Sequence, residues 1–179
     1  MSIDKTEAAE RLIVSAIQMV EREDDRLATH LVAASALRIL RELMGKDKKE
    51  YVAELLKIGM FTLAQMKLSR DIPDLPVPPK VANEVNELAE AIKCGEVTSA
   101  DDLKPTLEKP WELLKYIDDP ANFLKHADRD PLSVLSEDEF CPEDAISNAL
   151  TAYSFVCPGK PLPDEIRPYL KRNDFLQED

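Results

Sequence analysis

The segment from residue 26 to residue 44 constrains the fold most strongly, because its apolar residues cover nearly the whole circumference of a helix. Leu27, Leu31, Ala34 and Leu37 recur three and four residues apart, as along one face of a helix. After Arg26, only six polar residues interrupt the segment: Thr29, His30, Ser35, Arg38, Arg41 and Glu42. A helix that is apolar on almost every side is an interior helix. We therefore expect residues 26–44 to form the central helix, the most buried helix of the protein, ended by Gly45.

Helical periodicity continues in the other segments of the chain. Apolar spacings of three and four predict helices over residues 4–21, 49–68, 81–93, 110–117, 142–156 and 164–170. The chain has four glycines, few for a protein rich in tight β-turns, and its thirteen prolines lie mostly between the helical segments. We predict an all-α fold, a bundle of about five to seven helices centred on residues 26–44 and completed by the helices that begin at Val81 and Pro142.

A chain of 179 residues is long enough for one domain with a substantial core, and we expect a single domain over residues 1–179. The segment 71–79, DIPDLPVPP, has four prolines and must be an extended connection, either across the surface or as a stiff linker. Gly59 lies inside a helical pattern, so we expect it to mark a close approach to the central helix. The acidic C-terminal tail is expected to fray.

The charge distribution bears on the choice of partners. Residues 1–70 carry 12 Lys and Arg against 11 Asp and Glu, whereas the other 109 residues carry 11 against 24. A net charge of -12 argues against a general nucleic-acid binder, which needs a basic face. We attribute the acidity chiefly to solubility, with a basic partner or a cation as the alternatives.

Cysteine usage and hydropathy bear on location. The three cysteines form neither an even disulfide set nor a CxxC metal pair. No secretory leader is recognisable, and no apolar run reaches the roughly 18 residues that span a bilayer. We expect a cytoplasmic protein without membrane contact.

Polar residues of catalytic type are densest in the segment 119–131, DPANFLKHADRDP. Asp119 and Pro120 predict the start of a helix, on which Asn122 and His126 are four residues apart and share a face. The chain's only other histidine is His30. The candidate site therefore comprises one residue of the central helix and six of this segment: His30, Asn122, Lys125, His126, Asp128, Arg129 and Asp130.

Each histidine also has a structural interpretation. A histidine on a mostly apolar helix, such as His30, is more often a core residue with a buried hydrogen-bond partner than a ligand.

Metal binding needs three or four donors, for which His30, His126, Asp128 and Asp130 are the candidates, but HxxxH and HxxE spacings are absent. We therefore assign no metal and no cofactor. Cys141 begins a helix, yet neighbouring acids oppose thiolate formation, so a catalytic cysteine is not expected.

The two histidine segments resemble those of a family of small, uncharacterised bacterial helical proteins. That family pairs an early THLVAASALRIL-type helix with a later PANFLKHADRDP-type motif, and the resemblance covers roughly residues 8–153. The family has no settled activity, so the resemblance implies a helical fold and a site in these segments rather than a reaction.

A more distant resemblance is to the HEPN superfamily of all-helical ribonucleases and nucleotide-binding proteins. Its nuclease members place an Arg four to six residues before a His. Here Arg26 precedes His30 with three residues between, and Asn122 occupies the corresponding position before His126.

The sequence leads us to expect an intracellular helical module for binding or interaction. We expect it to form a homodimer, and its further partner to be a small molecule or another protein. The alternative is a HEPN-like ribonuclease or nucleotide-binding protein whose His126, Lys125 and Arg129 face phosphate.

Overall fold

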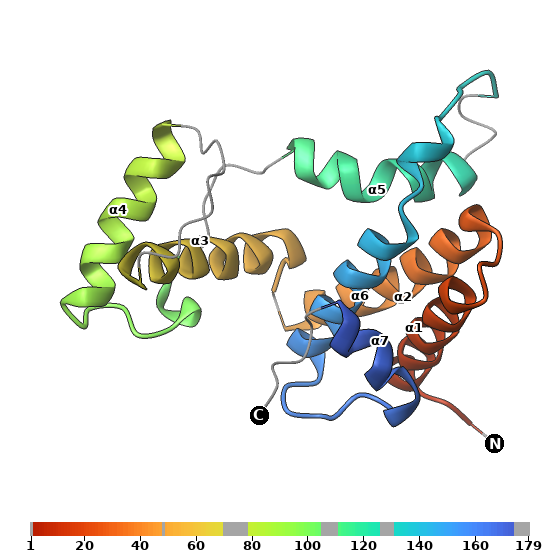
Figure 1. The fold of residues 1–179 in the computed structure, drawn as a ribbon, viewed down its shortest axis with the longest axis horizontal. Helices are drawn as coiled ribbons and strands as arrows, with labels where there is room; N and C mark the ends of the chain where they lie inside the picture. The colour runs from red at the N-terminus through yellow and green to blue at the C-terminus, as the bar shows by residue number, and fades with distance from the viewer. Residues whose placement is uncertain (1, 48, 70–78, 105–110, 126–130, 174–179) are drawn as a thin grey trace. The chain divides into compact units, whose positions relative to one another are not determined.

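The computed structural model describes residues 2–47, 49–69, 79–104, 111–125 and 131–173 (Figure 1). These residues form seven α-helices, with no strand among them. The helices are α1 (Lys5–Glu21), α2 (Arg26–Lys46), α3 (Tyr51–Ser69), α4 (Pro79–Lys93), α5 (Trp111–Lys125), α6 (Pro142–Val156) and α7 (Arg167–Arg172), with short 3-10 helices η1 (Ala100–Asp102), η2 (Glu137–Glu139) and η3 (Asp164–Ile166). The predicted all-α class and the number of helices are confirmed. Most of the proline-rich connection and the acidic tail lie outside the described residues.

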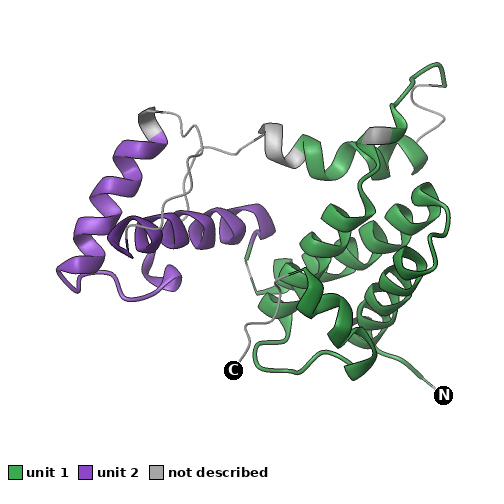
Figure 2. Cartoon of the chain, viewed as in Figure 1, with its two compact units in different colours: residues 1–49, 111–179 green, residues 50–110 purple. Residues whose placement is uncertain are grey.

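The chain divides into two compact units (Figure 2). Unit 1 comprises residues 1–49 and 111–179, and unit 2 comprises residues 50–110. Unit 1 contains α1, α2, α5, α6 and α7, whereas unit 2 contains α3, α4 and η1. We expected α4 to complete the bundle around α2, but α4 belongs to unit 2 and packs against α3. The single domain stays a prediction.

In unit 1, α1 and α2 follow each other closely and form a helical hairpin. The Asp4 carboxylate accepts a hydrogen bond from the Glu7 N–H at 2.7 Å, and the Asp25 carboxylate accepts one from the Ala28 N–H at 2.9 Å. Both aspartates therefore act as N-caps, satisfying amides that have no partner inside the helix. Between the helices, Glu23 has a φ of 56°, a left-handed conformation that lets the short turn reverse the chain.

The centre of unit 1 is α2, which packs against α1, α5 and α6. Its buried residues include Leu37 and Leu40, and it continues past Gly45 to Lys46 instead of ending at the glycine. Fully buried alanines lie on three helices that meet here: Ala9 and Ala16 of α1, Ala33 and Ala36 of α2, and Ala149 and Ala152 of α6. Small side chains allow the helix backbones to approach closely.

By its buried fraction, however, α6 exceeds α2. Seven of the 15 residues of α6 are buried, compared with eight of the 21 residues of α2. The expectation that α2 is the most buried helix is therefore wrong. The N-terminal residues of α2, before Thr29, and several polar residues toward its C-terminal end reach solvent. What makes α2 central is the number of helices that pack against it.

The helix α5 is longer than predicted. We expected one helix to end at Ile117 and another to begin at Pro120, but α5 continues through Pro120 to Lys125. A proline inside a helix lacks the N–H of one hydrogen bond and costs about 3 kcal/mol. Ile117, Pro120 and Ala121 are all buried on one face of α5, and their burial offsets this cost.

In unit 2, α3 and α4 share a small core. Ala64 of α3 and Val85 and Ala89 of α4 are buried together, with partly buried apolar residues packed around them. Gly59 is exposed, and within its own unit a Cβ added there would meet no described atom within 4 Å. The expected close approach is to the central helix, which belongs to the other unit, so it stays a prediction.

We predict that Leu37→Ala lowers the free energy of unfolding by about 2 to 5 kcal/mol, because the side chain is only 4% exposed in the α2 core. Leu27→Ala on the same helix is the control, since Leu27 is 37% exposed and should lose less than about 1 kcal/mol. Urea denaturation measures both. Equal effects of the two variants would contradict the central position of α2.

A polar cluster joins α1 to the end of α6. The Glu10 carboxylate accepts hydrogen bonds at 2.6 Å from both the Tyr153 hydroxyl and the Lys160 ammonium group. These hydrogen bonds hold the pKa of Glu10 below its usual 4.5, while burial and the bond to Glu10 raise the pKa of Tyr153 to about 12. At neutral pH, the negative charge of Glu10 is therefore balanced by the positive charge of Lys160, and Tyr153 is neutral.

We predict that Tyr153→Phe lowers the free energy of unfolding by about 1.5 to 3 kcal/mol, the usual contribution of a hydrogen bond to a charged group. Because the pKa of Glu10 is lower in the folded state, its contribution is present above pH 4.5 and is lost as pH falls below that value. The difference between wild type and variant should therefore shrink in acid.

Tyr116→Phe provides the control for Tyr153→Phe. Tyr116 also donates to a carboxylate at 2.6 Å, that of Asp144, but it is 60% exposed. We expect a loss below about 1 kcal/mol. Chemical denaturation of both variants across the acid range decides whether burial makes the Glu10 cluster stabilising.

Candidate functional site

His30 lies in the first turns of α2 and is only 5% exposed. Its imidazole packs edge-on against Phe140, with the ring centroids 5.7 Å apart. The Nδ1 atom lies 3.3 Å from the carbonyl oxygen of Cys141, the residue that precedes α6. A carbonyl oxygen can only accept, so we assign the proton of the neutral imidazole to Nδ1. The contact therefore joins the start of α2 to the start of α6.

This assignment leaves Nε2 of His30 as a buried acceptor. Nε2 has no hydrogen-bond partner among the described residues. Burial is the main reason that the pKa of His30 is lowered from 6.5, and it outweighs the opposing effects of the Cys141 carbonyl and the Asp144 carboxylate. His30 is therefore neutral at pH 7, and the site offers a lone pair rather than a positive charge.

His30 lines a small pocket between α2, α5 and α6. The other lining residues are Ala34, Leu37, Tyr116, Ile117, Pro120, Glu139, Cys141, Asp144, Ala145 and Asn148. The pocket has about 20 Å³ of room, which is enough for roughly one water molecule. It is too small, as it stands, for a nucleotide or a similar substrate.

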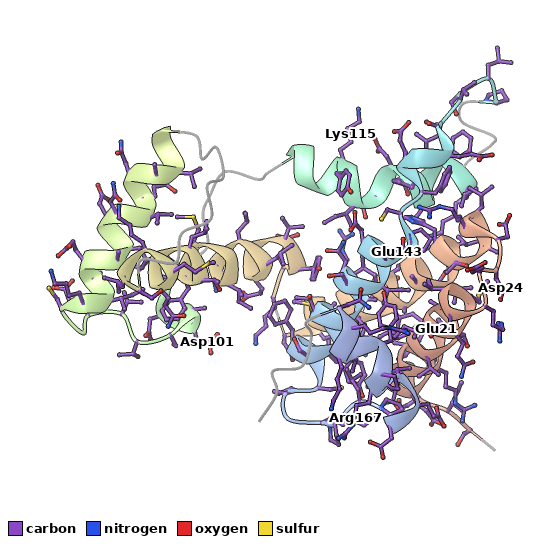
Figure 3. All side chains as sticks on the ribbon, in the orientation of Figure 1. Glu21, Asp24, Asp101, Lys115, Glu143 and Arg167 are labelled. Carbon is purple, nitrogen blue, oxygen red and sulfur yellow. The ribbon has the colours of Figure 1, made fainter. Side chains whose placement is uncertain are left out.

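Two acidic residues, Glu139 and Asp144, and the cysteine Cys141 line this pocket together with the imidazole. The Asp144 carboxylate accepts a hydrogen bond from Tyr116, which raises the pKa of Tyr116 to about 12. Burial raises the pKa of the Cys141 thiol, and the nearby Asp144 and Glu143 carboxylates act in the same direction. Cys141 is therefore a thiol, not a nucleophilic thiolate, at neutral pH. Figure 3 shows Glu143 on α6.

Of the seven predicted site residues, the structure describes His30, Asn122 and Lys125. Asn122 and Lys125 lie on α5 and are exposed, and neither lines the His30 pocket. Desolvation is the main cause that lowers the pKa of Lys125, with a smaller effect of the nearby Arg38 charge. His126, Asp128, Arg129 and Asp130 lie outside the described residues. The shared site of the two histidines stays a prediction.

Sequence reasoning missed the partners that His30 has in this pocket. Cys141, Asp144 and Tyr116 are between 86 and 114 residues away along the chain, and the contacts depend on how α2, α5 and α6 pack. The available local signal was the Cys141-Pro142 pair. It predicted where α6 begins, but not that His30 lies against this end of α6. Among the described residues, no group of three or more His, Cys, Asp or Glu side chains is placed to hold a metal ion.

A second hollow lies within unit 2, between α3, α4 and the residues after η1. Its lining residues are Leu56, Lys57, Met60, Glu84, Glu87, Leu88, Ala91, Leu103 and Lys104. The hollow has a volume of about 340 Å³, far larger than the His30 pocket and in the range of ligand-binding pockets. Its lining combines apolar side chains with the charged residues Lys57, Glu84, Glu87 and Lys104.

Comparison of the chain with protein-family models, curated proteins and solved structures finds no match. The resemblances to the small bacterial helical family and to HEPN proteins therefore stay predictions. In the described part of the chain, no helix is both long and apolar enough to cross a membrane.

We predict that the stability of the protein falls as the pH drops below 6.5, because the unfolded state then binds a proton at His30 that the folded state resists. Glu139, Asp144, Tyr116 and Cys141 are the titratable groups lining the pocket around it. His30→Phe should flatten this dependence, while the Cys141 carbonyl keeps its hydrogen bond from the Ala145 N–H.

The measurement is urea denaturation of wild type and His30→Phe at about pH 7.5 and about pH 5.5, on either side of the usual histidine pKa. The wild type should lose more stability between these values than the variant. Parallel losses in the two proteins would show that His30 is not the group responsible.

Proposed function

We propose that the protein is a helical interaction module without catalytic activity of its own, and that it self-associates through α3 of unit 2. The observation that carries the proposal is the amount of apolar surface that α3 leaves accessible. Twelve of its 19 residues are apolar, yet only Tyr51, Val52 and Ala64 are buried. Such a surface is typical of an interface.

The accessible apolar residues lie mainly opposite α4. Met60, Leu63 and Ala64 face the small core shared with α4. Helical geometry places Leu55, Ile58 and Met66 on the other side of α3. Ile58 is 40% exposed, and Leu55 and Met66 are partly exposed. A second copy of α3 would bury this face symmetrically, the commonest arrangement of soluble homo-oligomers.

The His30 pocket supports this proposal over an enzymatic one. Its roughly 20 Å³ of room matches about one water molecule, and the raised pKa of the Cys141 thiol keeps that thiol protonated at neutral pH. The HEPN-like alternative depends on His126 and Arg129, which lie outside the described residues, and stays a prediction.

We predict that Ile58→Glu weakens self-association by at least about tenfold, because a buried carboxylate without a partner is costly at an interface. Ile3→Glu is the matched control: it makes the same substitution at a residue of unit 1 that is 49% exposed. Sedimentation at micromolar concentrations should show a dimer for wild type and Ile3→Glu, and monomer for Ile58→Glu. A wild-type monomer over that range would contradict the proposal.

A further inference from the structure

The hollow between α3 and α4 is a surface different from the proposed self-association face. Its floor is apolar and comes from three segments of unit 2: Leu56 and Met60 of α3, Leu88 and Ala91 of α4, and Leu103 after η1. Met60 and Leu88 also pack against the buried cluster of Ala64, Val85 and Ala89. The floor is therefore continuous with the core of unit 2.

The rim of the hollow is charged and mainly acidic. Glu84 and Glu87 are exposed on α4, and no described side chain pairs with either. Lys57 also lines the hollow, but it is paired with Glu54 at 3.0 Å, and both side chains are largely buried. Among the described lining residues, Lys104 is thus the cation left without an ion-pair partner.

The acidic character extends beyond this rim. Glu87 and Ala91 also line a neighbouring open hollow, together with Asn86, Glu90, Cys94 and Glu96. Residues 81–104 carry six Asp and Glu against two Lys. Asp101, which Figure 3 labels on η1, is one of these acids. A partner that enters the apolar hollow therefore meets a negative surface on the α4 side.

We propose that this hollow binds a basic amphipathic helix of another protein, with an apolar side chain on the floor and Lys or Arg beside Glu84 and Glu87. This inference rests on the proposed function as an interaction module. A volume of about 340 Å³ accommodates one or two large apolar side chains rather than a whole small domain. The two acids are three residues apart and share one side of α4, so they can pair with cations one helical turn apart.

The probe for this proposal is a synthetic peptide of about 14 residues made of Leu and Lys in an amphipathic helical pattern. Two control peptides separate apolar from ionic binding. One replaces every Leu by Ser and keeps the charge, and the other replaces every Lys by Glu and keeps the apolar face. Fluorescence anisotropy of the labelled peptides measures their affinity for the full chain.

Variants of the protein locate the binding surface. Ala91→Trp fills the hollow without changing the charge, and Glu87→Lys reverses one charge on its rim. Glu165→Lys makes the same charge change at an exposed residue of unit 1 and is the matched control. Far-UV circular dichroism confirms that each variant retains its helical content.

We expect the Leu–Lys peptide to bind, and both Ala91→Trp and Glu87→Lys to weaken its binding by at least about tenfold, with Glu165→Lys within about twofold of wild type. Equal binding of the Ser–Lys peptide would show simple charge attraction and overturn the proposal, as would unchanged binding by folded Ala91→Trp. Absence of binding by the Leu–Lys peptide also overturns it. Sedimentation of the same samples tests self-association separately. If the protein is a dimer but does not bind the peptide, the proposed binding in the hollow is rejected and the proposed self-association is not.

Discussion

The close packing of alanines in unit 1 is the constraint on which the rest of its structure depends. Ala33 and Ala36 of α2 are completely buried, as are alanines of α1 and α6. Interiors packed at this density tolerate added volume poorly, because a larger side chain forces neighbouring helices apart. The separation of α1, α2 and α6 is therefore set by their smallest residues, and the large side chains fill the space around them.

The same packing explains why His30 is a buried polar residue. It lies at the beginning of α2, beside Phe140 and the first residue before α6. Thr29, also buried, satisfies its hydroxyl by donating to the Asp25 carbonyl oxygen within its own helix. Nε2 of His30 has no such hydrogen-bond partner within its own helix. A buried acceptor without any partner costs about 1 to 3 kcal/mol. The pocket beside His30 has room for about one water molecule.

The two units differ in how completely they bury their helices. In unit 1, α2 packs against three other helices, whereas the buried core shared by α3 and α4 consists of Ala64, Val85 and Ala89. A unit with so small a core leaves much apolar surface on its helices accessible. This difference is the physical basis for the binding surfaces proposed on unit 2, whereas His30 belongs to unit 1.

The sequence by itself determined the helices and most of their ends, because these depend on nearby residues. Asp4 and Asp25 cap the helices that follow them, Pro142 begins α6, and Gly95 adopts a φ of 76° just after α4. Tertiary structure decided the features that depend on distant residues. Burial keeps Pro120 inside α5, packing against α3 places α4 in unit 2, and the contact of His30 with Cys141 joins residues 111 positions apart. Local patterns predict hydrogen bonding within a helix, whereas the faces that meet are selected by the fit of side chains from the whole unit.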